Sequence, residues 1–231
     1  MELLEGEELA RLMEKEREAG GETPSSRAVK LGYILQVCLA LEYAHKRQIL
    51  HRDIRPSNIL VTPEGIVKLV HFGATPFTNE PGFSGGMLTG SIDYMSPEQV
   101  RGEPVDARSD LWSAGVTMYE IFTHSKAFPA GDIAEVLSAI VSREPKPMRE
   151  VRPDLPEELG AVLQRILKKQ PSERYQTAGE LLDDLDPIYR KMVLESGRAT
   201  VTMGEALLLG TTQPDLRMLA DSTRPRYRRP E

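Results

Sequence analysis

Strong positive charge, disulfide bonds and long apolar runs are all absent from this sequence of 231 residues. A single cysteine, Cys38, excludes an internal disulfide, and its leucine neighbours predict a small core residue rather than a reactive thiol. No apolar run approaches the roughly 18 residues of a membrane helix, and the acidic start "MELLEGEEL" is unlike a signal peptide. The net charge of −6 argues against nucleic acid as the main partner. We therefore expect a cytoplasmic protein without a membrane segment.

The composition and the spacing of apolar residues predict a mainly helical chain. A hydrophobic fraction of 40% and a charged fraction of 28% are typical of a soluble globular protein with one large domain or two small ones. Residues 7–18 are charged and helix-prone, and Thr23 followed by Pro24 is typical of a helix start. The next apolar residues recur at helical spacing and predict one buried face. They are Leu31, Ile34, Leu35, Cys38 and Leu39.

Later segments continue the helical pattern. Residues 109–123 carry apolar side chains on nearly every face, which predicts a buried central helix. Asp132 is a candidate N-cap for the amphipathic pattern that follows it, and a similar pattern recurs at 159–167. Thr177 and Glu180 have the spacing of a capping box ahead of the last apolar run.

Two short β-rich runs interrupt the helices. Residues 59–62 and 66–70 are joined by Pro-Glu-Gly, which predicts a β-hairpin. Residues 73–90 are rich in glycine and have no periodicity. Loops of this length are usually functional or mobile.

The stretch "HRDIRPSN" at residues 51–58 precedes the hairpin and has the residue types that phosphoryl transfer needs. The carboxylate of Asp53 can accept a proton from an attacking hydroxyl, and Arg55 can offset charge on the transferred group. The amide oxygen of Asn58 can hold Mg²⁺. The alternative is a polar turn in which His51 is packed and Asp53 caps a local backbone group.

Four motifs resemble those of eukaryotic-type serine/threonine protein kinases, and their sequences are most similar to the bacterial members of that family. "AHKRQILHRDIRPSNILVTPEGIVKLVHFGAT" resembles their catalytic and metal-binding loops, and "GSIDYMSPEQVRG" resembles the end of their activation segment. "DARSDLWSAG" resembles their buried central helix. Arg174, in "QPSERYQTAGELL", fits the arginine that pairs with Glu98, and Asp110 fits the residue that supports the catalytic loop. The resemblance covers roughly residues 1–186.

The resemblance implies a mainly α (α+β) fold, the large C-terminal lobe of a kinase with a small β-hairpin and no N-lobe. The kinase portion is expected at 1–190, starting at the hinge, and a partly disordered C-terminal tail at 191–231. ATP and Mg²⁺ are the implied cofactors, and a protein substrate or protein partner is implied. The implied site residues are the base Asp53 with Arg55 and Ser91, the nucleotide-binding Glu2, Asn58 and Leu60, and the metal ligand Asn58.

His71 departs from the kinase pattern because it replaces the aspartate of Asp-Phe-Gly, which binds Mg²⁺ in the family. Imidazole is a poor ligand for this hard ion, so a lost metal site is expected, although His71 could instead bind another metal or an effector. The Gly-rich loop and strand lysine of the small lobe are also missing, and Met1 falls on a hinge methionine. Either the gene encodes a lone large lobe or the reading frame begins upstream.

These features leave three hypotheses for the function. The first is a degenerate, pseudokinase-like or truncated protein that acts as a binding or regulatory module. The second is a serine/threonine kinase that is active only with an upstream or partner-supplied N-lobe. The third, a small-molecule phosphotransferase of the aminoglycoside type, is disfavoured by "YMSPEQ" and "SDLWSAG". An apolar patch is expected around Ile59, Leu60 and Leu69. The candidate phosphorylation sites are Thr75, Thr78, Ser84 and Thr89.

Overall fold

The computed structural model describes residues 5–19, 22–73 and 92–196. The chain separates into two units, Met1–Arg198 and Ala199–Glu231, and the second lies outside the described residues. Among the described residues, no helix has the length and apolarity needed to cross a membrane.

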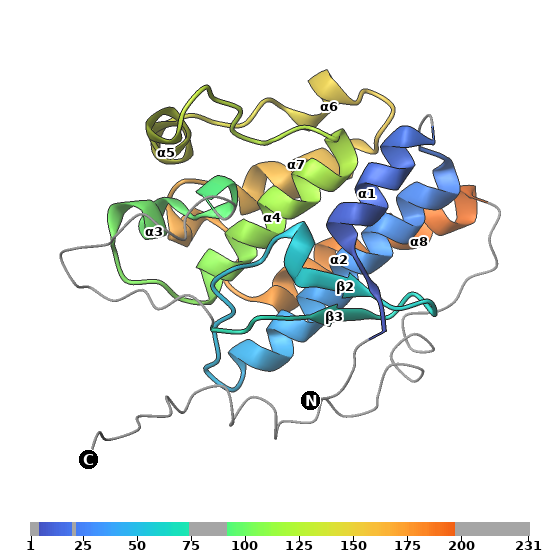
Figure 1. The fold of residues 1–231 in the computed structure, drawn as a ribbon, viewed down its shortest axis with the longest axis horizontal. Coiled ribbons are helices and arrows are strands. Elements are labelled where there is room, and N and C mark those ends of the chain that lie inside the picture. The colour runs from blue at the N-terminus through green and yellow to red at the C-terminus, as the bar shows by residue number, and fades with distance from the viewer. Residues whose placement is uncertain (1–4, 20–21, 74–91, 197–231) are drawn as a thin grey trace, which may run out of the picture. The chain divides into compact units, whose positions relative to one another are not determined.

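The prediction of a mainly helical chain with a small antiparallel sheet is confirmed (Figure 1). The elements in chain order are β1 (Glu7–Glu8), α1 (Leu9–Glu18), α2 (Pro24–His45), the 3-10 turn η1 (Pro56–Asn58), β2 (Ile59–Val61), β3 (Val67–Leu69), η2 (Ile92–Tyr94), α3 (Pro97–Arg101), α4 (Ala107–Thr123), α5 (Ile133–Ser142), α6 (Met148–Val151), α7 (Glu157–Ile166), η3 (Pro171–Glu173) and α8 (Ala178–Glu195).

Helix α4 is the central helix of the described part of the chain, as its apolar residues on nearly every face predict. It packs against α2 on one side and α7 on the other, and α2 in turn lies along α8 (Figure 1). Trp112 and Phe122 are completely buried. At Gly115 an added Cβ would lie 2.6 Å from the side chain of Ile166, so the absence of a side chain lets α7 approach α4 closely. Through Asp110, this helix also holds the backbone at residues 51–52 of the candidate site.

The sheet has three strands in the order β1-β2-β3, all antiparallel. The predicted hairpin is β2 and β3, in which Leu60 faces Lys68. Glu7 and Glu8, which we expected to be helical, instead pair with β2, so the helix begins at Leu9. The helical prediction failed at these two residues because pairing with β2 outweighs their local preference.

Side-chain caps start several helices. Thr23 and Ser26 form a reciprocal capping box at α2, and Asp132 accepts from the backbone N–H of Glu135 at 2.8 Å. Thr177 also caps α8, because its hydroxyl accepts from the N–H of Glu180 at 3.1 Å. The second bond of the expected capping box is not formed. The carboxylate of Glu180 accepts from the backbone N–H of Gln176 at 3.0 Å instead of from that of Thr177.

Two further expectations concern burial. Cys38 is completely buried, as predicted, and burial raises the pKa of its thiol to about 12, so it is unreactive. The expected apolar patch is wrong at Ile59, which is completely buried beneath the sheet. Leu60 and Leu69 are half-buried, so the exposed apolar surface on these strands is smaller than expected.

Candidate functional site

A single carboxylate, that of Asp110, holds the backbone of the loop at residues 51–53. Asp110, in the first turn of α4, accepts from the backbone N–H of His51 at 2.9 Å and of Arg52 at 2.7 Å. The Nε2 atom of His45, at the end of α2, lies 2.8 Å from the same carboxylate. The support from Asp110 confirms the prediction for this residue. His45 was missed, because no local pattern links side chains that are 65 positions apart.

Asp53 and Asn58 lie together at one end of this loop. The side-chain amide of Asn58 donates to the carboxylate of Asp53 at 2.7 Å and to its backbone carbonyl at 2.8 Å. Because both bonds use the amide nitrogen, the amide oxygen of Asn58 remains available as an acceptor. The 3-10 turn η1, which starts at Pro56, places Asn58 in this position.

Arg55 is only loosely paired. Its Nε atom lies 3.6 Å from the carboxylate of Asp53, beyond hydrogen-bond distance. This nitrogen is buried and has no hydrogen-bond partner among the described residues. The guanidinium therefore has bonding capacity that a negatively charged group could use.

The turn at residues 70–73 packs against the same loop. The rings of His51 and Phe72 have centroids 4.4 Å apart, and the N–H of Gly73 donates to the carbonyl of His51 at 3.3 Å. The N–H of Val70 donates to the carbonyl of Asn58 at 3.0 Å. Burial lowers the pKa of His51, although the carboxylates of Asp110 and Asp53 partly oppose this shift. His51 is therefore a packed, neutral residue at neutral pH.

His71 follows β3 and is exposed. Its φ of 66° is in the left-handed region, as are the φ of 69° at Arg52 and of 63° at Gly73. Histidine is tolerated in this region better than most residues, as are asparagine and aspartate. Such backbone conformations concentrate at functional turns. The backbone at His71 is thus compatible with an aspartate.

The side chains at this turn do not fit Mg²⁺. The ion needs hard oxygen ligands, and the residues offer the amide oxygen of Asn58, the carboxylate of Asp53 and the imidazole of His71. Within the described ranges, the one group of three acidic, histidine or cysteine side chains close enough to hold a metal lies elsewhere. We therefore derive no chemical step through a metal at this turn.

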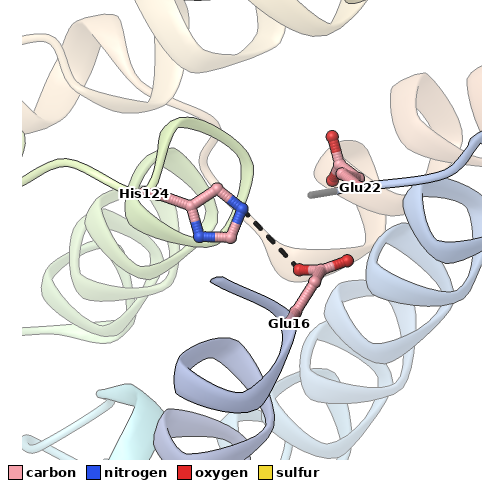
Figure 2. Close-up of side chains that lie close together, drawn as sticks. All are labelled: Glu16, Glu22 and His124. Atoms are coloured by element: carbon pink, nitrogen blue, oxygen red, sulfur yellow. Dashed lines mark ion pairs between the residues drawn. The ribbon is translucent and has the colours of Figure 1, made fainter. Parts of the chain in front are cut away.

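That group consists of Glu16, Glu22 and His124, which come from α1, the segment before α2 and the end of α4 (Figure 2). The ammonium of Lys30 lies among them. It forms an ion pair with Glu16 and lies 2.7 Å from the carboxylate of Glu22 and 3.3 Å from Nε2 of His124. The space that a metal would need is therefore filled by a cation of the chain itself.

Charge within this cluster shifts two pKa values. Burial alone would raise the pKa of Glu22, but hydrogen bonds from Lys30 and Arg152 outweigh it and lower the pKa. Burial and the charge of Lys30 lower the pKa of His124, against the opposing carboxylates of Glu16 and Glu22. The carboxylate of Glu22 is therefore ionised and the imidazole of His124 neutral at neutral pH.

A second buried ion pair joins α3 to the turn before α8. Glu98 and Arg174 form two parallel hydrogen bonds of 2.7 and 2.8 Å, as predicted. Ser109 donates to Glu98 at 2.7 Å, and Arg174 also donates to the backbone carbonyl of Lys168 at 2.7 Å. The pair joins α3 to the turn before α8, and the bonds to Ser109 and to the carbonyl of Arg108 connect it to α4.

The structure brings three of the predicted site residues together, Asp53, Arg55 and Asn58. Leu60 is in β2, and His71 is in the turn after β3. The other predicted site residues and the candidate phosphorylation sites lie outside the described residues. They are Glu2, Thr75, Thr78, Ser84, Thr89 and Ser91. The roles assigned to all these residues stay predictions.

Comparison with known proteins gives the family. Residues 1–184 match the family described as protein kinase domain. A probable serine/threonine-protein kinase of Clostridium acetobutylicum is 34% identical over 194 residues, which cover 84% of this chain and 30% of that protein. The tyrosine-protein kinase MasK of Myxococcus xanthus is 37% identical over 73% of this chain and 28% of its own length.

A third relative, the serine/threonine-protein kinase PknB of Mycolicibacterium smegmatis, is 38% identical over 69% of this chain and 26% of its own length. The chain thus spans less than a third of each of these relatives. The matched residues include the buried pair of Glu98 and Arg174 and the loop that Asp110 supports. The chain belongs to the protein kinase family.

Proposed function

We propose that this chain is a degenerate member of the kinase family that acts as a protein-binding or regulatory module. The observation that carries the proposal is His71, which occupies the turn where the family places a metal-binding aspartate. A metal ion supplies much of the charge stabilisation in phosphoryl transfer, so its loss removes much of the catalysis. The surrounding framework is kept, which supports a role that depends on the shape of the lobe.

Calorimetric titration of the purified chain with ATP and Mg²⁺ tests this proposal. We expect no measurable nucleotide binding, because the turn lacks the hard ligand that would hold the metal with the nucleotide phosphates. The matched variant is His71→Asp, which supplies a carboxylate in a backbone conformation that aspartate tolerates. Micromolar binding of Mg-ATP by the unmodified chain would refute the proposal.

The second candidate function is an ATP-dependent serine/threonine protein kinase whose N-lobe is supplied by an upstream segment or by a partner. The contact between Asn58 and Asp53 supports it, because it holds the candidate base and leaves an amide oxygen for a ligand. The test is incorporation of labelled phosphate into a protein substrate by a chain extended upstream. Activity should disappear in Asp53→Asn and rise in His71→Asp, and incorporation no greater than in Asp53→Asn would exclude this candidate.

A further inference from the structure

A cleft of about 300 Å³ lies beside the loop that carries Asp53. One wall is α1, which contributes Met13 and Arg17, and the floor is the segment 55–57. The other wall is the end of α4 with Lys126. A segment of a bound protein that reached Asp53 from this side would place a side chain in the cleft.

The two arginines of the cleft are incompletely paired, whereas Lys126 is engaged by Glu120, Asp93 and the hydroxyl of Tyr94. The guanidinium of Arg17 makes no hydrogen bond within the described part of the chain, and its ion pair with Glu14 measures 3.9 Å, near the limit for such a pair. The buried Nε of Arg55 is likewise unpaired there. Both guanidinium groups can therefore donate to a negatively charged group without breaking a strong contact.

The carboxylates of the cleft, by contrast, are engaged or peripheral. One oxygen of Glu120 accepts from the hydroxyl of Tyr94 at 2.5 Å, and the other lies 3.0 Å from the ammonium of Lys126. Glu14 is mostly exposed at the rim. A basic side chain entering the cleft would have to compete with Lys126 for Glu120 and would face the two arginines.

The cleft also has a fixed wall. Lys30 pairs with Glu16 of α1 and donates to the backbone carbonyl of Ile121 in α4 at 3.1 Å, so it links the two helices. Glu16 also lies 3.6 Å from His124 (Figure 2). His124 lines the cleft as well. Arg17 follows Glu16 in α1, so the same contacts hold its backbone beside the cleft.

We propose that this cleft receives a negatively charged side chain, acidic or phosphorylated, of a protein segment that lies across residues 55–57. The inference deepens the proposed function as a binding module, on which it rests, by naming the chemistry of the partner. Arg17 and Arg55 provide the contacts, and Lys126 adds positive charge at the far wall. Specificity follows from charge complementarity, since like charge in the cleft would be repelled.

Fluorescence polarisation with short labelled peptides tests the inference without nucleotide. Each peptide pool has a central serine, degenerate flanks and one scanned position fixed as phosphoserine, glutamate, alanine or lysine. We expect glutamate to bind about two- to fivefold more tightly than alanine, and phosphoserine about tenfold. Lysine should bind most weakly. The glutamate and phosphoserine arms distinguish an acidic partner from a phosphorylated one.

The variant Arg17→Glu should abolish the preference for the anionic peptides. The matched control is Arg190→Glu, because Arg190 is 64% exposed, Arg17 is 67% exposed, and only Arg17 lines the cleft. Equal binding of all four pools, or no effect of Arg17→Glu, would overturn the inference and leave the binding module standing. Failure of every pool to bind would count against both.

Discussion

The charged groups in two regions of the candidate site differ in how completely they are paired. We call the region around Glu98, Arg174 and Asp110 the framework, and the region around Asp53, Arg55 and His71 the open side. In the framework, Arg174 makes hydrogen bonds to both oxygens of Glu98, and Asp110 accepts from two backbone N–H groups and contacts His45. On the open side, Arg55 is 3.6 Å from Asp53 and its Nε is unpaired among the described residues.

We therefore expect the framework to determine the stability of the fold, and the open side to determine what the site can bind. Buried charges must be paired, so a change in the framework costs folding free energy. The open side is partly exposed, and its backbone is in the left-handed region at Arg52 and His71, so we expect substitutions of its side chains to cost less folding free energy. We therefore expect the fold to tolerate either histidine or aspartate at residue 71, and a fold alone does not establish a reaction.

The largest expected effect comes from breaking the framework at Arg174. Arg174→Met leaves the carboxylate of Glu98 buried without its partner, and we expect the free energy of unfolding to fall by about 3–5 kcal/mol. Urea denaturation followed by circular dichroism measures it. Arg174→Lys should recover only part of the loss, because one ammonium cannot make the two parallel bonds.

Arg190→Met is the control for that experiment, since Arg190 is an exposed residue with one ion pair to Asp186 on its own helix. It should change the free energy of unfolding by less than about 0.5 kcal/mol. Equal losses of unfolding free energy in Arg174→Met and Arg190→Met would show that the buried framework is no more sensitive to substitution than the exposed surface.

A somewhat smaller effect is expected at Lys30, the internal cation of the cluster in Figure 2. Lys30→Met should cost about 2–4 kcal/mol, less than an isolated buried pair because Arg152 still binds Glu22. Zn²⁺ should leave the melting temperature of the unmodified chain unchanged and raise that of Lys30→Met. Stabilisation of the unmodified chain by Zn²⁺ would show that a metal, not Lys30, belongs in this cluster.

Acid should weaken the fold through two histidines with lowered pKa values, His51 and His124. As the pH falls through the ordinary value of 6.5, the unfolded chain takes up protons that the folded chain resists. The free energy of unfolding should therefore fall, by at most about 1.4 kcal/mol per pH unit for each histidine. Urea titrations across this range measure the slope, and His124→Gln should make it shallower. A slope of the opposite sign would contradict the burial argument.

The sequence predicted the parts of this molecule that local patterns and family motifs encode. The apolar faces of α2 and α4, the N-cap at Asp132 and the paired Glu98 and Arg174 all follow from spacing or motif. Contacts between distant segments with no motif could not be predicted.

Three such contacts were missed. His45 contacts the carboxylate of Asp110, and Lys30 lies among Glu16, Glu22 and His124. Glu7 and Glu8 pair with β2. Each depends on the tertiary arrangement, which brings together side chains or strands whose neighbours in sequence give no signal. A motif also brought Asp53 and Asn58 together, and the structure has them in contact, while their catalytic and metal-binding roles stay predictions.

The smallest effect on stability, and the sharpest test of the comparison, is expected at His71. His71→Asp should change the free energy of unfolding by less than about 0.5 kcal/mol, because the side chain is exposed and aspartate accepts a positive φ. His71→Ala should cost more, since alanine is less tolerant of this backbone conformation. The two variants differ in ligand chemistry as well, because only aspartate adds a hard oxygen ligand next to the amide of Asn58. Urea denaturation with and without Mg²⁺ and ATP should therefore show stabilisation by these ligands in His71→Asp alone. A loss in His71→Asp as large as that in Arg174→Met would place residue 71 in the framework and end the separation of stability from chemistry.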